Sequence, residues 1–425
     1  MSTGPLEGIR VIEVSTGISG PFMGRHLAHY GAQVIKLETK KAPDGVRLYV
    51  PLWDKTLGIQ PDLSPGLHEW HTGKTYGSLD LSNPRALELL KGLAAKADIM
   101  FVNYSAEAMD KLGLKYETFK AVNPKLIYIT MLGFGLSGPY RNFSAWGPQI
   151  EGISGLLHVT RRPQDPPGKG FAYPDYLASY HGFFAAMAAL TYRQKTGKGQ
   201  HIDISMVELG ACTLGHFVLE QTVNNRTVAP LGNRSDTYAP QGCYPCHGDD
   251  RWCVIACTTQ DEWEALCRAM GQPQLPKDKR FATMLDRMSH QDALDAIIAK
   301  WTEDKTPHEV MYDLQRTGVP AGALQNAEDL YFRDPHMAAR NYFQWCDHDK
   351  KKAKVLANGL GFRLSEPSEW ANRTGISVGQ DNELIYKQIL GLTEEQYQEY
   401  LKAGAIEPAP EWKPAPKESL KLRYG

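Results

Sequence analysis

Several features that would assign this chain of 425 residues to a common class of protein are missing. The N-terminus has no basic stretch followed by an apolar one, so we expect a cytoplasmic protein without a signal peptide. No apolar run approaches the roughly 20 residues that span a bilayer. The net charge of −1 predicts no nucleic-acid partner and no membrane surface. Neither an H-x-x-x-H spacing nor a Ser-His-Asp order occurs, so no metal centre is expected.

Cysteine is scarce, and its distribution is uneven. Five of the seven cysteines fall between Cys243 and Cys267, and Cys243 and Cys246 form a C-x-x-C. Zinc would need a second pair at matching spacing, which is absent, and a redox pair would stand at the start of a helix. The stretch CYPCHGDDRWCVIAC instead predicts two strands around a turn, with reduced thiols.

The alternation of apolar patterns indicates an α/β protein. GIRVIEVS predicts a strand, PFMGRHLAHYGA a helix and QVIKLE a second strand, and the pattern repeats toward LIYITMLGFG. Such alternation is typical of an open, Rossmann-like parallel sheet. We therefore expect a large Rossmann-like domain over residues 1–224 and a linker with a small α+β domain over 225–335. A return segment with a C-terminal helix over 336–425 would pack on the large domain.

A dinucleotide site is one interpretation of the first turn, STGISGPFMG. Gly17, Gly20 and Gly24 have the wrong spacing for it, and Pro21 removes an N–H that a pyrophosphate would use. Cationic residues near the predicted strand ends could meet a nucleotide phosphate, although each is more often a solvated surface charge: Lys36, Lys40, Lys41, Arg47, Lys74 and Lys111.

Asp175 opens a long apolar run. Between Tyr176 and Tyr192 the pattern is apolar nearly all round, which predicts a buried helix that ends at TGKGQ. In that position Asp175 is most simply an N-cap, and a carboxylate at a helix N-terminus is expected to stay ionised. The same group can act as a nucleophile if an acyl donor reaches it. His181 on the same helix is expected to be a packed core residue.

The chain resembles the class III CoA-transferase family, which includes formyl-CoA, carnitine and bile-acid CoA-transferases. The similar stretches run in order along nearly the whole length, as LEGIRVIEVSTGISGPFMGRHLAHYGAQVIKLE, GKTYGSLDLSNPRALELL, MLGFGLSGPYRN, PDYLAS, TGKGQHIDISMVE and LGNRSDTYAPQGCYPC. The resemblance implies an interlocked, ring-like dimer, either a homodimer or a heteromer with a paralogous subunit. It also implies coenzyme A as acyl-CoA substrate, an organic acid acceptor, and Asp175 as the nucleophile.

Other roles are implied residue by residue. The coenzyme A contacts carried over are Thr16, Ile18, Ser19, Thr39, Lys40, Lys74, Asn103, Tyr104, Lys111 and Gly133. Aromatic residues would line the acceptor pocket, namely Phe143, Trp146, Tyr173 and Tyr238. This sequence departs from the family in four places. Ile18 replaces a glutamine of formyl-CoA transferase, Thr39-Lys40 replaces an arginine that usually packs by the adenine, YSAE replaces the family's FxPG after Asn103, and NRSDTYAPQG lacks the glycine-rich lid of formyl-CoA transferase.

We expect CoA transfer from an acyl-CoA such as succinyl-CoA to a bulky or aromatic acid, for which a benzylsuccinate-type dicarboxylate is suitable. One alternative is an α-methylacyl-CoA racemase, whose histidine and neighbouring aspartate would fall at Trp146 and Gly147. A second alternative is a catalytically silent CoA-binding subunit of a heteromeric transferase. Retention of Asp175 favours the transferase.

Overall fold

The structure is a computed structural model that describes residues 4–48, 61–168, 170–348, 353–366, 372–374 and 376–411. The chain forms two compact units. The first comprises Met1–Gly155, Lys169–Gly215 and Ala339–Gly425, and the second comprises Leu156–Gly168 and His216–Ala338. The domain boundaries predicted from the sequence, after residues 224 and 335, stay a prediction. Each unit is described by itself below.

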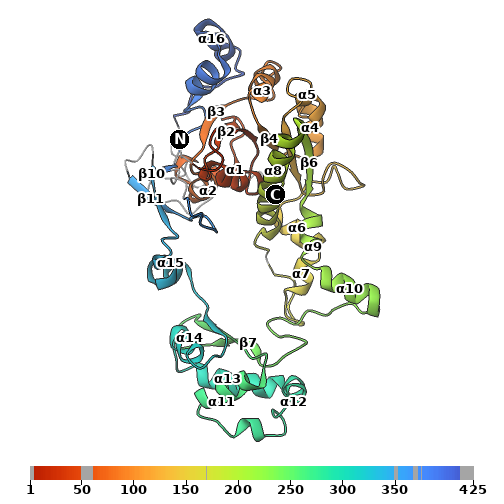
Figure 1. Cartoon of the computed structure of the whole chain (residues 1–425), viewed down its shortest axis with the longest axis vertical. Helices are drawn as coiled ribbons and strands as arrows, with labels where there is room; N and C mark the ends of the chain where they lie inside the picture. The colour runs from red at the N-terminus through yellow and green to blue at the C-terminus, as the bar shows by residue number, and fades with distance from the viewer. Residues whose placement is uncertain are drawn as a thin grey trace. The chain divides into compact units, whose positions relative to one another are not determined.

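A six-stranded parallel sheet forms the centre of the first unit, in the order β3-β2-β1-β4-β5-β6 (Figure 1). Its strands are β1 (Arg10–Val14), β2 (Gln33–Glu38), β3 (Thr75–Ser78), β4 (Ile99–Val102), β5 (Ile127–Leu132) and β6 (Gln200–Ser205). The strand order reverses between β1 and β4. In open α/β sheets, ligands bind outside the carboxyl ends of the strands at such a switch point. The predicted α/β class with a parallel sheet is confirmed.

Helices cover both faces of this sheet. On one face α1 (Ser19–His29) packs along α8 (Tyr173–Thr196) (Figure 1). On the other face lie α3 (Ala86–Ala95), α4 (Ala106–Leu112) and α5 (Tyr116–Lys120). Strands enclosed on both faces have near-continuous apolar runs, which is why the alternation of strand and helix was readable from the sequence.

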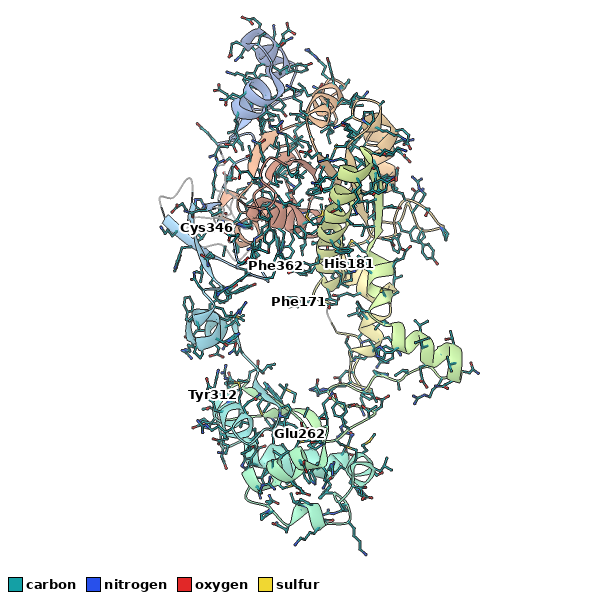
Figure 2. The ribbon with its side chains drawn as sticks, viewed as in Figure 1. Phe171, His181, Glu262, Tyr312, Cys346 and Phe362 are labelled. Atoms are coloured by element: carbon teal, nitrogen blue, oxygen red, sulfur yellow. The ribbon has the colours of Figure 1, made fainter. Side chains whose placement is uncertain are left out.

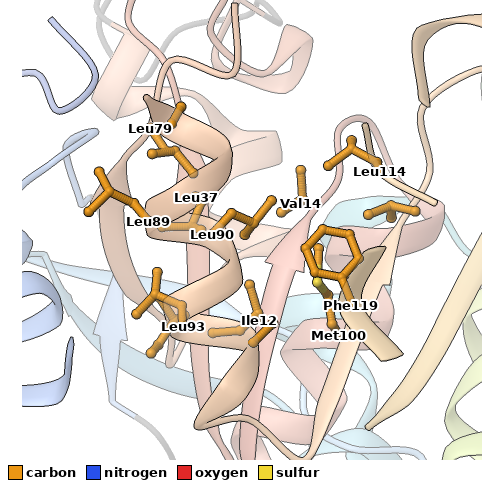
Figure 3. Close-up of a cluster of buried hydrophobic side chains, with 14 of the residues drawn as sticks. Ile12, Val14, Leu37, Leu79, Leu89, Leu90, Leu93, Met100, Leu114 and Phe119 are labelled. Atoms are coloured by element: carbon orange, nitrogen blue, oxygen red, sulfur yellow. The ribbon is translucent and has the colours of Figure 1, made fainter. Parts of the chain in front are cut away.

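The apolar core between the sheet and α3 is a cluster of buried side chains. Ile12, Val14 and Met100 from the strands meet Leu90 and Leu93 from α3 (Figure 3), and all five are fully buried. The C-terminal part of the chain joins the same core through Tyr386 of the π-helical segment η6 (Glu383–Leu390) and Tyr397 of α16 (Glu394–Lys402).

The remaining elements of the first unit are short. They include α2 (Pro65–Trp70), α6 (Gly147–Ile153), α9 (Met206–Cys212) and a small sheet of β10 (Gln344–His348), β11 (Ala353–Ala357) and β12 (Arg373–Thr374). Helix α15 (Pro335–Ala339) belongs to the second unit except for its last residue.

The second unit has a small antiparallel sheet, β7 (Gln241–Pro245), β8 (Trp252–Ala256) and β9 (Ala321–Ala323). Strands β7 and β8 form the hairpin predicted for CYPCHGDDRWCVIAC, and all seven cysteines of the chain are free thiols. Helices complete this unit: α7 (Leu156–Val159), α10 (Gly215–Asn224), α11 (Gln260–Ala269), α12 (Met284–Ser289), α13 (Gln291–Thr302) and α14 (Pro307–Gln315). Its core is centred on Trp263, Leu266 and Leu294.

The expectation that the long apolar helix is buried all round is wrong. Helix α8 ends where predicted, with Gly197 in the left-handed conformation, but only one of its faces packs on α1 and the sheet. On its outer face Phe184 and Tyr192 are exposed, Phe184 by 72%, while Tyr180 is half exposed at the edge of this face and its ring also contacts Phe22 and His26 of α1. Aromatic periodicity cannot distinguish a core-facing side chain from one that faces a partner. No helix in the described part of the chain is long and apolar enough to cross a membrane.

Truncation of the α3 core tests this packing. Leu90→Ala should lower the free energy of unfolding by about 2–5 kcal/mol, because a fully buried leucine leaves a cavity that the neighbouring strands cannot close. Lys91→Ala, on the same helix but partly exposed, is the control and should change stability by less than about 1 kcal/mol. Equal effects of the two substitutions in chemical denaturation would contradict the described core.

Candidate active site

Asp175 is the third residue of α8, not its N-cap. The helix begins at Tyr173, and Ala172 occupies the cap position in the left-handed conformation (φ 59°, ψ 34°) without a side-chain cap bond. Pro174 fits the first turn because its missing N–H has no intrahelical partner there. The predicted capping role is therefore wrong. The carboxylate still lies in the first turn, where the positive end of the helix dipole is strongest.

The carboxyl group of Asp175 is covered even though the residue as a whole is partly exposed. Its Oδ2 atom is buried and has no hydrogen-bond partner within the described ranges. It lies against the first residue of α6, since a Cβ atom added to Gly147 would clash with Asp175 Oδ2 and with Ala172. Any side chain at position 147 would displace the carboxyl group, so this backbone approach requires glycine.

Burial raises the pKa of Asp175 to about 7, a hydrogen bond to the backbone of Ser19 opposes this rise, and the charge of Glu151 adds to it. Near neutral pH the group is therefore partly protonated, whereas the sequence predicts a carboxylate that stays ionised. The helix dipole acts on a group that has lost most of its water, and the loss of solvation is the larger effect. An acid with a pKa near neutrality is suited to nucleophilic or proton-transfer chemistry.

The turn after β1 is pinned to the end of β4. Asn103 accepts a hydrogen bond from the Thr16 N–H (2.8 Å) and donates from Nδ2 to Thr16 O (2.6 Å) and to Ser19 Oγ (3.1 Å). Ser179 of α8 donates to Ser19 O (2.6 Å), which ties the same turn to the helix that carries Asp175. The predicted contacts Thr16, Ile18, Ser19 and Asn103 therefore lie together, beside the carboxylate and at the switch point of the sheet.

A cluster of buried ionisable side chains is hydrogen-bonded to this turn. Asp44 accepts hydrogen bonds from Thr16 Oγ1 (3.0 Å) and Gly17 N (2.9 Å), while its other oxygen pairs with Lys36 (3.2 Å). Glu13 pairs with Lys36 (3.5 Å) and Lys74 (2.7 Å). These ionic side chains are completely or almost completely buried, so each depends on the others for solvation.

The proposed phosphate contacts divide into two groups. Lys74 lies inside the buried network, where burial lowers its pKa to about 8, and Lys36 and Arg47 are equally buried and ion-paired. Lys40, Lys41 and Lys111 are exposed, with Lys111 paired to Glu107 at 2.6 Å. The surface charges near the strand ends are thus fewer than the sequence indicates.

Three other predicted contacts lie at different points along the carboxyl edge of the sheet. Thr39 donates to Glu407 Oε2 (2.7 Å), which also accepts from the Lys40 backbone N–H (2.9 Å). Tyr104 packs on the core beside α4, and Gly133 follows β5 and lies against Ile150 of α6. Thr39 and Lys40, which replace the family's arginine, therefore form a turn that is hydrogen-bonded to Glu407 of the C-terminal segment.

The aromatic residues assigned to the acceptor pocket are half-exposed in the first unit. Phe143 stacks on Tyr140 (ring centroids 4.8 Å apart), Trp146 is the N-cap of α6 next to Gly147, and Tyr173 is the first residue of α8. Tyr238 belongs to the second unit, where it lines a cavity of ≈ 320 Å³ together with Phe217 and Arg234.

Two residues near Asp175 were not predicted from the sequence, and a third residue, His181, was predicted in the wrong environment. Gly147 and Glu151 contact the Asp175 turn from α6; the only signal in the sequence is a lone acid in an otherwise apolar helix. His181 is exposed on α8 (Figure 2), and its Nδ1 donates a hydrogen bond to Leu177 O (2.8 Å), so the predicted core position is wrong.

The Asp175 carboxyl group thus lies beside the switch point of a parallel sheet, where open α/β proteins bind their ligands. The chain belongs to CoA-transferase family III, whose model matches residues 6–382. It is therefore a class III CoA-transferase, as the resemblance predicted.

Relatives and solved structures agree with this assignment. The chain is 32% identical to the succinyl-CoA–D-citramalate CoA-transferase of Chloroflexus aurantiacus, over 92% of this chain and 95% of that one. It is 30% identical to the succinate–glutarate CoA-transferase of Agrobacterium fabrum, over 79% and 84% of the two chains. A CAIB/BAIF family protein from Brucella suis has a similar structure, with a TM-score of 0.81, 29% identity and coverage of 91% of this chain and 100% of that one.

The raised pKa of Asp175 makes folding stability depend on pH. The unfolded acid ionises near pH 3.8 and the folded one near 7, so wild-type protein loses stability as pH rises between these values. Asp175→Asn has no such group. As the pH rises from 5 to 8.5, the free energy of unfolding of Asp175→Asn relative to that of wild type should increase by about 2–4 kcal/mol, with no further increase above pH 8.5. The free energy of unfolding of both proteins is measured by chemical denaturation at each pH. A difference between the two proteins that stays constant over this pH range would contradict the burial of an ionisable Asp175.

Proposed function

We propose that this enzyme moves CoA from succinyl-CoA to a dicarboxylic acid acceptor, with Asp175 as the nucleophile. The observation that carries the proposal is the Asp175 carboxyl group at a helix N-terminus beside the β1–α1 turn, with Oδ2 buried and without a hydrogen-bond partner in the described ranges. A desolvated carboxylate is a stronger nucleophile than a hydrated one, and among the described residues no donor competes for its Oδ2.

The reaction follows from this nucleophile in balanced steps. A carboxylate oxygen of Asp175 attacks the thioester carbonyl of succinyl-CoA, the C–S bond breaks, and a mixed anhydride and CoA thiolate form. The thiolate attacks the Asp175 carbonyl of the anhydride, which releases succinate and leaves an aspartyl-CoA thioester. The acceptor carboxylate attacks that thioester and forms a second anhydride with release of CoA thiolate. Attack of the thiolate on the acceptor carbonyl then gives acceptor-CoA and free Asp175.

The bond energy of the thioester is kept throughout, so the transfer consumes no ATP. Oxyanions form at the Asp175 carbonyl and at the acyl carbonyl in each step. The positive end of α8 stabilises the first of these charges because it acts in a site from which water is excluded.

The coenzyme A site is proposed to extend from this turn along the carboxyl edge of the Rossmann-like sheet. Thr16, Ile18, Ser19 and Asn103 would contact the pantetheine end. For the nucleotide end we propose Thr39, Lys40, Tyr104, Lys111 and Gly133. Lys74 acts from within the buried network on the shape of the turn, because its ammonium group is already bound to Glu13.

The acceptor is proposed from the relatives and from the aromatic surface. Both relatives act, by name, on succinate or succinyl-CoA and on a second dicarboxylate. Phe143, Trp146 and Tyr173 each leave about half of their area exposed, which supports a bulky or aromatic acceptor of the benzylsuccinate type. A panel of dicarboxylates with and without an aromatic ring separates the two acceptor classes.

The racemase alternative lacks its acid–base pair. Its histidine position is Trp146 and its aspartate position is Gly147, where no side chain fits beside Asp175. The alternative of a silent CoA-binding subunit is disfavoured by the retained and covered nucleophile.

The outer face of α8 supports a dimer. Tyr180, Phe184 and Tyr192 leave an apolar stripe in water that a soluble monomer rarely retains. We propose that a second copy of this chain covers the stripe in an interlocked homodimer, the heteromer with a paralogous subunit being the other outcome of the test.

Trapping of the intermediate tests the nucleophile. Wild-type enzyme incubated with succinyl-CoA and then treated with hydroxylamine should carry a hydroxamate on Asp175, identified by peptide mass spectrometry. Asp175→Ala should lower CoA transfer about 10³-fold or more, because the covalent route is removed. Asp165→Asn, an exposed acid elsewhere, should retain wild-type rates. An unmodified Asp175 with every acyl-CoA supplied would sink the mechanism.

A charge on the α8 stripe tests the dimer. Phe184→Glu should weaken self-association at least about tenfold in sedimentation velocity, since it places a carboxylate in an apolar interface. Gln194→Glu, an exposed polar position on the same helix, should leave association unchanged. A wild-type chain that stays monomeric alone but pairs with a paralogous subunit would support the heteromer instead.

A further inference from the structure

Glu151 is a buried acid beside the nucleophile that the transfer chemistry does not itself require. It lies on α6, is only 3% exposed, and accepts hydrogen bonds at Oε1 from the backbone N–H groups of Tyr173 (2.6 Å) and Phe171 (3.2 Å). Its other oxygen, Oε2, is buried without a hydrogen-bond partner in the described part of the chain. This second oxygen lies against Gly170, where a Cβ atom would clash with it.

The two bonds to Oε1 hold the turn that leads to Asp175. They bracket Ala172, whose left-handed backbone is unusual for a residue with a Cβ atom and costs on the order of 1 kcal/mol. Tyr173 supplies the first N–H of α8, two residues before Asp175. The carboxylate of Glu151 therefore determines where the first turn of α8 begins, and with it where the Asp175 side chain lies.

The charge of Glu151 is not needed for these bonds. A glutamine would offer the same acceptor oxygen with a smaller desolvation cost, because a buried carboxylate with one partnerless oxygen is among the expensive groups in a protein. The charge does have an effect on a neighbouring group, because it raises the pKa of Asp175.

We propose that Glu151 is a positioning residue for Asp175: its Oε1 holds the 171–173 turn from which the Asp175 side chain is placed, and its buried negative charge acts on the Asp175 carboxyl group. This inference rests on the proposed role of Asp175 as nucleophile. Its consequence is a carboxyl group that is kept in place and ionises near neutral pH, where it forms a reactive rather than a strongly stabilised carboxylate.

The groups around Asp175 agree with this division of roles. Glu151 faces it from α6, Tyr176 from the same helix and the Ser19 backbone from α1. Burial raises the pKa of Asp175 first, and of the charged groups in the described ranges Glu151 raises it most. The pKa of the Tyr176 hydroxyl is raised as well, so that group is neutral over the working pH range.

Two substitutions at position 151 distinguish the effect of the hydrogen bonds that hold the 171–173 turn from the effect of the Glu151 charge on Asp175. Glu151→Gln keeps the acceptor and the size but removes the charge. The pH midpoint of Asp175 acylation by succinyl-CoA should fall by roughly one unit, with the rate at high pH unchanged within about threefold. Glu151→Asp keeps the charge but withdraws it from the turn. Its midpoint should stay near that of wild type while the plateau rate falls about 10²-fold.

The protonation of Asp175 can also be followed without turnover. In protein labelled with ¹³C at aspartate carboxyl groups, the Asp175 signal is the one that disappears in Asp175→Asn. Its titration midpoint should be lower in Glu151→Gln than in wild type. Glu208→Gln, an exposed acid on α9, is the matched control and should not move it.

The outcomes divide cleanly. An Asp175 titration that Glu151→Gln leaves in place overturns the role of the charge, and a plateau rate that Glu151→Asp leaves in place overturns the holding role. If the titration shifts as expected but wild-type enzyme forms no adduct at Asp175, the positioning stands and the proposed transfer mechanism fails. Activity losses that only follow the folded fraction, measured by circular dichroism, count against the proposal.

Discussion

The ion network beneath the β1–α1 turn is the constraint on which the site depends. Glu13, Lys36, Asp44 and Lys74 are removed from water and can be ionised only while they pair with one another. Asp44 also holds the backbone of the turn at Gly17, so the pairing geometry determines the shape of the surface at the switch point. Loss of any member would leave a charge unpaired in the interior and distort the turn that adjoins the nucleophile.

Burial also determines the pKa of the Asp175 carboxyl group. Asp175 and Glu151 are two acids on adjacent helices, one without a donor at Oδ2 and the other bound to the backbone that precedes α8. Their burial moves the pKa of Asp175 to about 7, against the pull of the helix dipole. In this chain desolvation has the largest effect on the pKa of the Asp175 carboxyl group, and the charge of Glu151 adds to it.

Much of the fold could be read from the sequence, and the reasons are local. The strand RVIEV and the helix after it have patterns that a parallel sheet with two covered faces demands, and CYPCHGDDRWCVIAC has the turn chemistry of a hairpin. The resemblance identified the family, and Asp175 was singled out before its surroundings were known. The sequence did not reveal the exposed face of α8, the burial of Lys74 or the contacts of α6 with the Asp175 turn. Each of these features depends on which distant segment of the chain packs there.

The sequence by itself determined the order of strands and helices, the family, and the residue proposed as nucleophile, since periodicity and short motifs are properties of neighbouring residues. The tertiary structure alone decided that Asp175 is not a cap, that Gly147 and Glu151 surround it, and that Lys36 and Lys74 are paired in the interior instead of facing a ligand. The physical reason is desolvation. The ionisation and reactivity of a charged group depend on what covers it, and the covering groups come from parts of the chain that no local pattern connects.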